Sequence, residues 1–222
     1  MNVAGVPPTS PAGQQISFSL SLTSPYPLDI TGEVALSFQP DAVAPALDPA
    51  LQFSSGGTTV GFTIPANSTT AVPIALQTGT VSGTITLTFT LSAGGVNVPG
   101  FQNTITILRS SPVIQSVKLV TTSAGLEVHV VGFSPERDLT EADLTFTAAP
   151  GATLQTTNVT GNLASIATTW YQSAVSTQYG SQLMLVLPFT ASQGSVDAVG
   201  SVSVVLKNAK GSSPATSEFQ FD

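Results

Sequence analysis

The sequence predicts an all-β protein built from two β-sandwich domains in tandem, and three observations lead to this prediction. Apolar residues alternate with Ser and Thr in successive short runs, a period of two that is typical of strands. Pro, Gly, Asn and Asp, which favour turns, fill the spacers between the runs. The pattern is interrupted near residue 112, after which a second series of similar runs begins.

The first domain is predicted over residues 14–108. Its strands are expected in the runs "QISFSLSL", "EVALSF", "TVGFTI" and "TITLTFTL", each with an apolar face for the core and a hydroxyl-rich face for water. About seven runs precede residue 108, which is the strand count of an immunoglobulin-like sandwich. Residues 1–13 are rich in Pro, Ser and Gly and are expected to form a flexible tether.

The second immunoglobulin-like sandwich is predicted over residues 114–222. Pro112 breaks the pattern, so residues 109–113 ("RSSPV") are expected to be a short linker. The predicted strands are "QSVKLV", "GLEVHVVGF", "DLTFTA", "LQTTNV", "QLMLVLPF", "SVSVVLKN" and "SEFQF". A helical turn is expected only in "SPERDLTEADL", because Thr140 followed three residues later by Asp143 resembles a capping box.

Composition limits the classes of partner. Charged residues make up 8% of the chain, about a third of the usual globular share, and this scarcity favours an exported all-β module. The net charge is −7, and residues 1–108 contain no Lys, Arg or His. Phosphate-driven binding of nucleic acid needs such cations, so we expect no nucleic-acid partner.

Signal peptides and membrane spans are the two kinds of segment that bear on the compartment of the protein and on its association with a membrane. The first fifteen residues lack the basic and apolar regions of a signal peptide, and no run approaches the length of a membrane span. We therefore expect no membrane insertion. We also expect an extracellular or cell-surface protein whose signal peptide is not in this chain, which would make the chain a mature or excised fragment.

The segment "VGFTIPANSTTAVPIALQTGTVSGTITLTFTLSAGG" resembles bacterial exported immunoglobulin-like, fibronectin-III-like and, distantly, Calx-β-like modules. This resemblance implies a scaffold or interaction role and names no ligand. Calx-β modules carry acidic calcium ligands in the turn after the stretch similar to "IALQ". Here that turn is Gln77-Thr78-Gly79-Thr80, without a carboxylate, so calcium binding is not expected there.

Catalytic chemistry is not expected. His129 is the only histidine, and in "GLEVHVV" it shares the water-facing side of a strand with Glu127. There is no G-x-S-x-G nucleophile elbow and no phosphate-, dinucleotide- or zinc-binding motif. We therefore predict no catalytic residues, no cofactor and no enzyme activity.

An acidic cluster is the only candidate for a metal site. It consists of Glu136, Asp138, Glu141 and Asp143, with Arg137 among them. Carboxylates suit a hard cation such as calcium, but their spacing fits no EF-hand loop. The alternatives are a weak calcium site and a solvated turn that Arg137 partly neutralises.

The stretch "TTWYQSAVSTQYGSQ" (residues 168–182) is the only aromatic candidate for a ligand site. If it is a strand, Trp170 and Tyr171 point to opposite faces, and we expect Trp170 in the core and Tyr171 outside. The alternative is a platform in which Tyr171 and Tyr179 contact a carbohydrate or a peptide.

Two functions remain. The first is a structural, adhesive or spacer module of a secreted or cell-surface bacterial protein, which contacts protein partners or other modules of the same polypeptide. The second is a carbohydrate-binding accessory module of a larger secreted enzyme.

Overall fold

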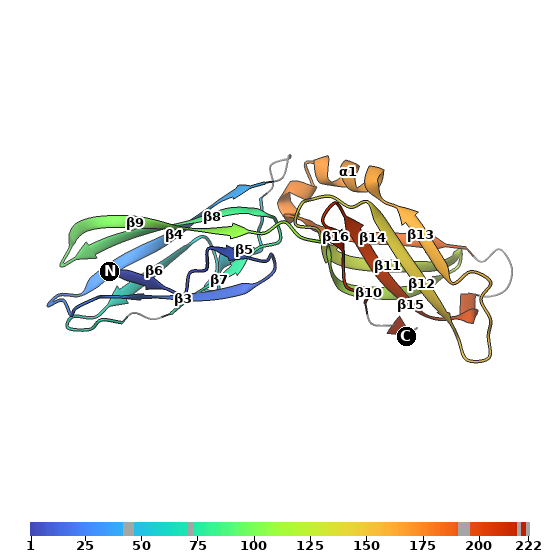
Figure 1. The fold of residues 1–222 in the computed structure, drawn as a ribbon, viewed down its shortest axis with the longest axis horizontal. Helices are drawn as coiled ribbons and strands as arrows, with labels where there is room; N and C mark the ends of the chain where they lie inside the picture. The colour runs from blue at the N-terminus through green and yellow to red at the C-terminus, as the bar shows by residue number, and fades with distance from the viewer. Residues whose placement is uncertain (42–46, 71–72, 191–195, 217–218, 221–222) are drawn as a thin grey trace. The chain divides into compact units, whose positions relative to one another are not determined.

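The computed structural model describes residues 1–41, 47–70, 73–190, 196–216 and 219–220. The chain divides into two compact units, Met1–Arg109 and Ser110–Asp222 (Figure 1). Each unit contains two β-sheets, and helices are confined to short segments. The predicted class, all-β with two immunoglobulin-like sandwiches in tandem, is confirmed.

The first unit has a four-stranded and a five-stranded sheet. The four-stranded sheet has the order β1 (Asn2–Ala4), β3 (Gln15–Ser21), β7 (Ile74–Thr78), β5 (Leu51–Phe53). The five-stranded sheet has the order β2 (Thr9–Ser10), β9 (Val96–Ile107), β8 (Gly83–Ala93), β4 (Ile30–Pro40), β6 (Thr59–Ile64). Phe18 of β3 meets Phe89 of β8 edge to face, with ring centroids 6.1 Å apart, so the two sheets share one core.

The prediction of a flexible tether over residues 1–13 is wrong. β1 pairs antiparallel with β3, from Asn2 opposite Ser21 to Ala4 opposite Ser19. β2 pairs in parallel with β9, with Thr9 opposite Thr106. Both segments are too short to show a period of two, and what holds them is backbone pairing along the edges of the two sheets.

The turn after β7 is anchored by an acidic residue from a distant part of the chain. Asp48 accepts hydrogen bonds from the backbone N–H groups of Thr80 (2.5 Å) and Val81 (2.9 Å). Burial raises the pKa of Asp48, although these backbone hydrogen bonds act in the opposite direction. A carboxylate therefore lies at this turn, but its oxygens are occupied by backbone amides.

The second unit has a three-stranded and a five-stranded sheet. The three-stranded sheet has the order β10 (Val113–Thr122), β11 (Gly125–Phe133), β14 (Gln182–Phe189). The other has the order β13 (Asn158–Asn162), β12 (Glu141–Ala148), β15 (Val199–Asn208), β16 (Gly211–Ser212), and β17 (Phe219–Gln220) also pairs with β15. The remaining residues of the predicted strand "SEFQF" lie outside the described residues.

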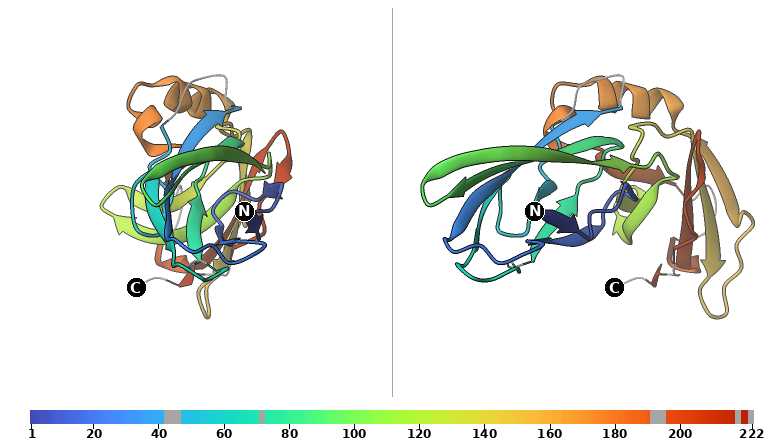
Figure 2. Two further views of the ribbon diagram at one scale, coloured as in Figure 1. Left: turned by 90° about the vertical axis from the view of Figure 1, so that its left-hand side faces the viewer. Right: turned by 60° about the vertical axis from the view of Figure 1, so that its left-hand side comes forward.

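The two sheets of the second unit contain three and five strands, and a helix lies on the side where the three-stranded sheet is narrower. β10 lies against β15 and β17 of the wider sheet, so β14 is at the opposite edge, on the side of β13. The helix α1 (Ala164–Gln172) follows β13 and lies along this side (Figures 1 and 2). Ala167 and Tyr171 of α1 join the core formed by both sheets. The 3-10 helices η1 (Ser176–Tyr179) and η2 (Val196–Ala198) complete the unit.

Candidate functional site: an apolar groove beside β14

The aromatic stretch at residues 168–182 does not form the predicted strand. Residues up to Gln172 belong to α1, and Ser176–Tyr179 form η1. Leu163, Ala167 and Tyr171 are buried at intervals of four residues, which is the spacing of a helix face. The hydroxyls of Thr168 and Thr169 donate to the carbonyls of Ala164 and Ser165, one helical turn earlier.

Tyr171 is a core residue, so its predicted place on the outer face is wrong. Its side chain is 3% exposed, and its hydroxyl donates to the Ser181 carbonyl at 2.9 Å. Burial raises the pKa of this hydroxyl, which outweighs the opposing charge of Arg137, so the hydroxyl keeps its proton and donates. Tyr171 forms part of the floor of a groove and offers almost no surface of its own.

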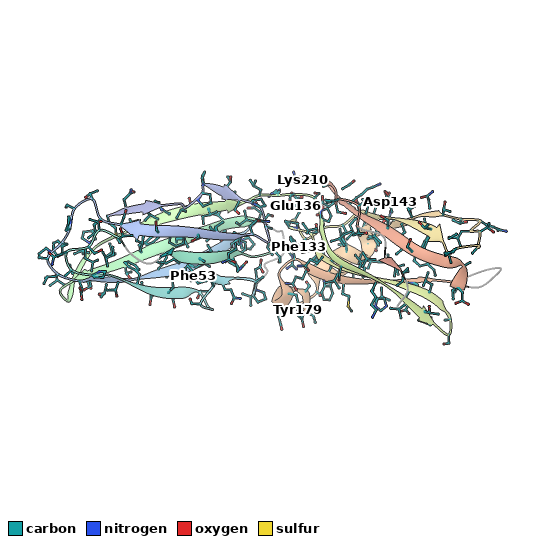
Figure 3. The ribbon with its side chains drawn as sticks, turned by 90° about the horizontal axis from the view of Figure 1, so that it is seen from below. Phe53, Phe133, Glu136, Asp143, Tyr179 and Lys210 are labelled. Atoms are coloured by element: carbon teal, nitrogen blue, oxygen red, sulfur yellow. The ribbon has the colours of Figure 1, made fainter. Side chains whose placement is uncertain are left out.

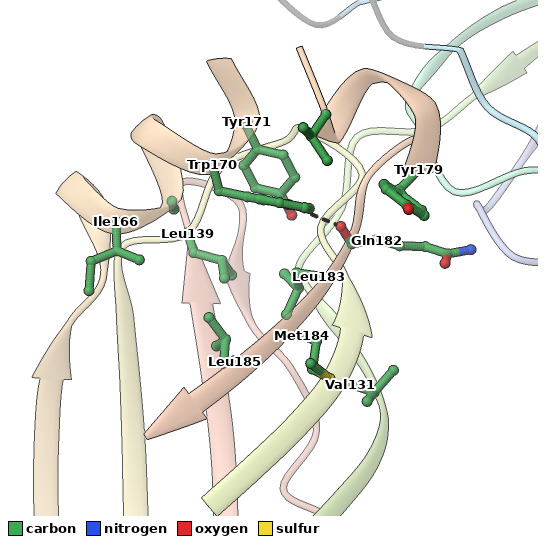
Figure 4. A pocket seen from close by; sticks show the side chains of 12 residues that line it. Val131, Leu139, Ile166, Trp170, Tyr171, Tyr179, Gln182, Leu183, Met184 and Leu185 are labelled. Atoms are coloured by element: carbon green, nitrogen blue, oxygen red, sulfur yellow. Dashed lines mark hydrogen bonds between the residues drawn. The ribbon is translucent and has the colours of Figure 1, made fainter. Parts of the chain in front are cut away.

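Trp170 is only partly buried, and it forms the rim of that groove together with Tyr179 (Figure 4). The indole Nε1 donates to the Gln182 carbonyl at 3.3 Å. The rings of Trp170 and Tyr179 are 6.4 Å apart between centroids and inclined by 25°. Tyr179 is 49% exposed, so of the two tyrosines predicted to contact a ligand, it alone reaches the surface.

The groove lies between α1, η1 and β14 and has a volume of about 590 Å³. Ile166 and Val175 line its helical side, while Met184 and Leu185 line its strand side. Three of these side chains are mostly exposed: Met184 (68%), Ile166 (61%) and Val175 (57%). The twelve lining residues, all within the described part of the chain, include no charged residue. Exposed apolar side chains gathered in this way make the groove a candidate binding site.

Arg137 holds in place the segment that forms one wall of the groove. Its guanidinium donates to the carbonyls of Gly180 (2.7 Å) and Tyr171 (2.5 Å) and to the Ser176 hydroxyl (2.9 Å). Its carbon Cζ also lies 5.3 Å from the centre of the Tyr171 ring. These contacts tie the segment that carries Tyr179 to the turn before β12. The Arg137 side chain is buried, so the expectation of a solvated turn is wrong at this residue.

The acidic residues do not gather into one site. Glu136 lies near Lys210, at 3.7 Å (Figure 3). Asp138 accepts hydrogen bonds from Ser134 and Ala209. Glu141 and Asp143 both pair with Lys207 across the β12–β15 ladder, at 2.5 and 2.6 Å. Among the residues that the structure describes, no group of three or more metal-binding side chains is placed to hold an ion.

The predicted helical turn at Thr140 is also wrong. Thr140 precedes β12, and its backbone N–H donates to the Lys207 carbonyl of β15. The capping-box pattern is therefore a coincidence at the start of a strand. His129 lies on the outward face of β11, with Nε2 2.8 Å from Glu127 Oε2, which is the face that the alternation predicts.

Sequence reasoning missed Ile166, Val175 and Met184. One signal was present: "QLMLVLPF" does not alternate, because Met184 and Val186 are apolar at the positions that face away from the core. The helix residues gave no such signal, since the stretch was assigned to a strand.

No protein-family model matches the chain, and no curated protein is significantly similar to it. Among solved structures, the FN1–FN3 domains of chicken CNTN1 are similar at 12% identity and a TM-score of 0.27, covering 99% of this chain and 65% of that one. The chain thus spans less than two thirds of that structure's length. A two-domain fibronectin type III segment from chicken tenascin is similar at 10% identity and a TM-score of 0.32, covering 95% and 94%. The class 5 fimbriae chaperone CfaA is similar at 10% and 0.30, covering 100% and 99%. The similarity is one of fold alone.

Proposed function

We propose that this chain is a non-enzymatic, protein-binding module of a secreted or cell-surface protein, with a structural or adhesive role. The partner is a separate protein or another module of the same polypeptide. The observation that carries the proposal is the uncharged groove between α1 and β14, with its exposed apolar side chains. The low charge content of the chain supports the proposed location.

The chemistry of the groove favours a peptide over a sugar. A sugar presents many hydroxyls, and a site for one combines an aromatic ring with several hydrogen-bonding side chains. Here the half-exposed pair Trp170 and Tyr179 supports a carbohydrate-binding module as the second candidate. However, aliphatic side chains surround the pair, and Gln182 has the only side-chain amide among the lining residues. Apolar side chains of a protein segment match such a surface better.

A displayed library of random eight-residue peptides tests this function, with a glycan array on the same protein in parallel. Met184→Glu places a charge in the groove. Val96→Glu, in the first unit, is a matched control because Val96 and Met184 are 67% and 68% exposed. We expect selected peptides to bind the wild type and Val96→Glu equally and to bind Met184→Glu at least tenfold more weakly.

Two results would contradict the proposal. If no peptide is selected, or if Met184→Glu binds the selected peptides as well as wild type does, the groove is not a protein-binding site. Glycan binding that is lost in Trp170→Ala would instead establish the carbohydrate-binding alternative.

Among the described residues, no helix is long and apolar enough to cross a membrane.

A further inference from the structure

We propose that the partner segment binds as an added β-strand on the free edge of β14, and that this segment is an extended, uncharged peptide. This inference rests on the function proposed above and specifies how the groove is filled. It follows from the backbone of β14, from the width of the two sheets, and from the charge of the groove.

The edge of β14 that faces the groove is not paired by any described strand, because β14 ends the order β10-β11-β14. In an antiparallel ladder, successive residues direct their N–H and C=O groups alternately toward and away from the neighbouring strand. The Ser181 carbonyl accepts from Ser134 N on the β11 side, whereas the Gln182 carbonyl accepts from Trp170 Nε1 on the other side. The even-numbered residues of β14 therefore present their backbone groups to the free edge.

Pro188 gives independent support for this assignment. Proline has no N–H, so it is tolerated in a strand only where that group would face away from the ladder. Pro188 lies opposite Glu127 of β11 and has the same parity as Gln182. The Gln182 carbonyl and Pro188, at opposite ends of β14, thus both indicate that the even-numbered residues direct their backbone groups to the free edge.

The free edge has a defined length. Met184 and Val186 each present an N–H and a C=O group, and Pro188 presents a C=O group. At Gln182 the indole of Trp170 already occupies the carbonyl, so the ring stops an added strand at this point. The edge therefore accepts a segment of about five residues, since one residue in two pairs with β14.

On both faces of the sheet, an added strand would contact apolar side chains of β14. Leu185 and Leu187 face the core but are only half-buried, because the narrow sheet has no fourth strand beyond β14. An added strand would take this position and cover them. Met184 and Val186, on the outward face, are 68% and 43% exposed and would gain cross-strand neighbours. Exposed apolar edge strands of this kind template strand addition.

The charge of the groove determines the class of peptide. The whole chain has a net charge of −7, yet neither the lining residues nor β14 carry a charge. A buried charge without a partner is costly, so a charged peptide would lose affinity in this site. An uncharged segment with apolar side chains at alternate positions is complementary to it.

Hydrogen exchange on the whole chain tests the proposal directly, with a peptide from the library described above as the probe. In the free protein, the amides of Met184 and Val186 should exchange fast, while that of Leu185 is protected by β11. Saturation with the peptide should slow exchange at Met184 and Val186 at least tenfold and leave Leu185 unchanged. Binding without this change at either amide would overturn strand addition.

A scan of N-methylated versions of the same peptide gives the complementary result. Methylation should weaken binding at least tenfold at every second residue, where the N–H faces β14, and only slightly between them. Val186→Pro, which removes a free-edge N–H, should bind the unmethylated peptide more weakly while the Tm stays near that of wild type.

The two levels of the proposal fail differently. If Met184→Glu abolishes binding but the methylation effects do not alternate, the groove still binds peptides and only the added strand is wrong. If the peptide binds equally to Met184→Glu, the proposed function fails as well.

Discussion

β6 and β14 are both edge strands, β6 of the five-stranded sheet in the first unit and β14 of the three-stranded sheet in the second, and their outward faces differ in chemistry. On β6, which ends the five-stranded sheet of the first unit, the outward positions are Thr59, Gly61 and Thr63. On β14 they include Met184 and Val186. A polar or small outward face protects an edge from association, and an apolar one invites it. The proposed peptide-binding role therefore concerns the edge of β14 and not that of β6.

The units also differ in how they are closed. Four strands face five in the first unit, whereas three face five in the second, and α1 fills part of the difference. The helix stabilises the second core through Tyr171 and forms the groove with Trp170. The same nine-residue segment therefore supplies both stability and surface.

The largest expected effect is on the stability of the second unit when its helix loses the buried ring. Tyr171→Ala should lower the free energy of unfolding by about 3–5 kcal/mol, as other large-to-small core changes do. Tyr171→Phe, which removes only the hydrogen bond to Ser181, should cost about 1 kcal/mol. Denaturant unfolding measures both. If Trp170→Ala lowers the free energy of unfolding more than Tyr171→Ala does, the assignment of Tyr171 to the core and Trp170 to the rim is wrong.

Removing the buried guanidinium should have the next largest effect. Arg137→Met removes the guanidinium donor from the carbonyls of Gly180 and Tyr171, and losing hydrogen bonds from a buried charged group costs about 3 kcal/mol. The segment that carries Tyr179 should then loosen, so peptide binding should weaken together with stability. A thermal melt and a peptide titration of the same variant measure the two effects. Wild-type values in both would show that Arg137 does not support the groove.

A smaller effect is expected in the first unit. Asp48→Ala removes the carboxylate that accepts from the backbone N–H groups of Thr80 and Val81, at a cost of about 1–3 kcal/mol. We propose that the units unfold independently, so calorimetry should show this loss in one transition only. A shift of both transitions would mean that the units unfold together, and the comparison would lose its basis.

The smallest effect is a difference in pH response. The pKa of Asp48 is raised by burial, so its protonation favours the folded first unit below pH 3.8, and this contribution is lost as the pH rises through the folded-state pKa. Hydrogen bonds from Lys207 and Thr160 lower the pKa of Asp143, so its contribution to the second unit is present above pH 3.8 and lost on acidification.

Calorimetry at pH values on either side of 3.8 measures this difference. Acidification should destabilise the second unit relative to the first, and Asp143→Asn should reduce the effect. The opposite order of the two transitions would contradict these assignments.

Alternation along the strands predicted most of the fold. Runs such as "TITLTFTL" have a period of two over their whole length, so β8 and its neighbours follow from the sequence. Residues 1–13 could not be placed in the same way, because backbone pairing with β3 and β9 holds them and side-chain pattern does not.

The candidate site was only partly predictable. The single tryptophan lies in the segment that lines the groove, but assigning this segment to a strand reversed the expected places of Trp170 and Tyr171. In a strand, adjacent residues face opposite sides, which placed Trp170 in the core. In the helix α1, Leu163, Ala167 and Tyr171 form the buried face, so the Tyr171 ring is in the core. The groove itself depends on the unequal width of two sheets, which no local pattern encodes.

The fluorescence of Trp170 tests the central claim most directly, because it is the only tryptophan in the chain and it lies on the rim of the groove. In the free protein, acrylamide should quench it partly. A peptide bound in the groove should shift its emission to shorter wavelength and reduce the quenching, with the same Kd as an independent binding measurement. Peptide binding that leaves both the emission and the quenching of Trp170 unchanged would place the contact elsewhere and contradict the account.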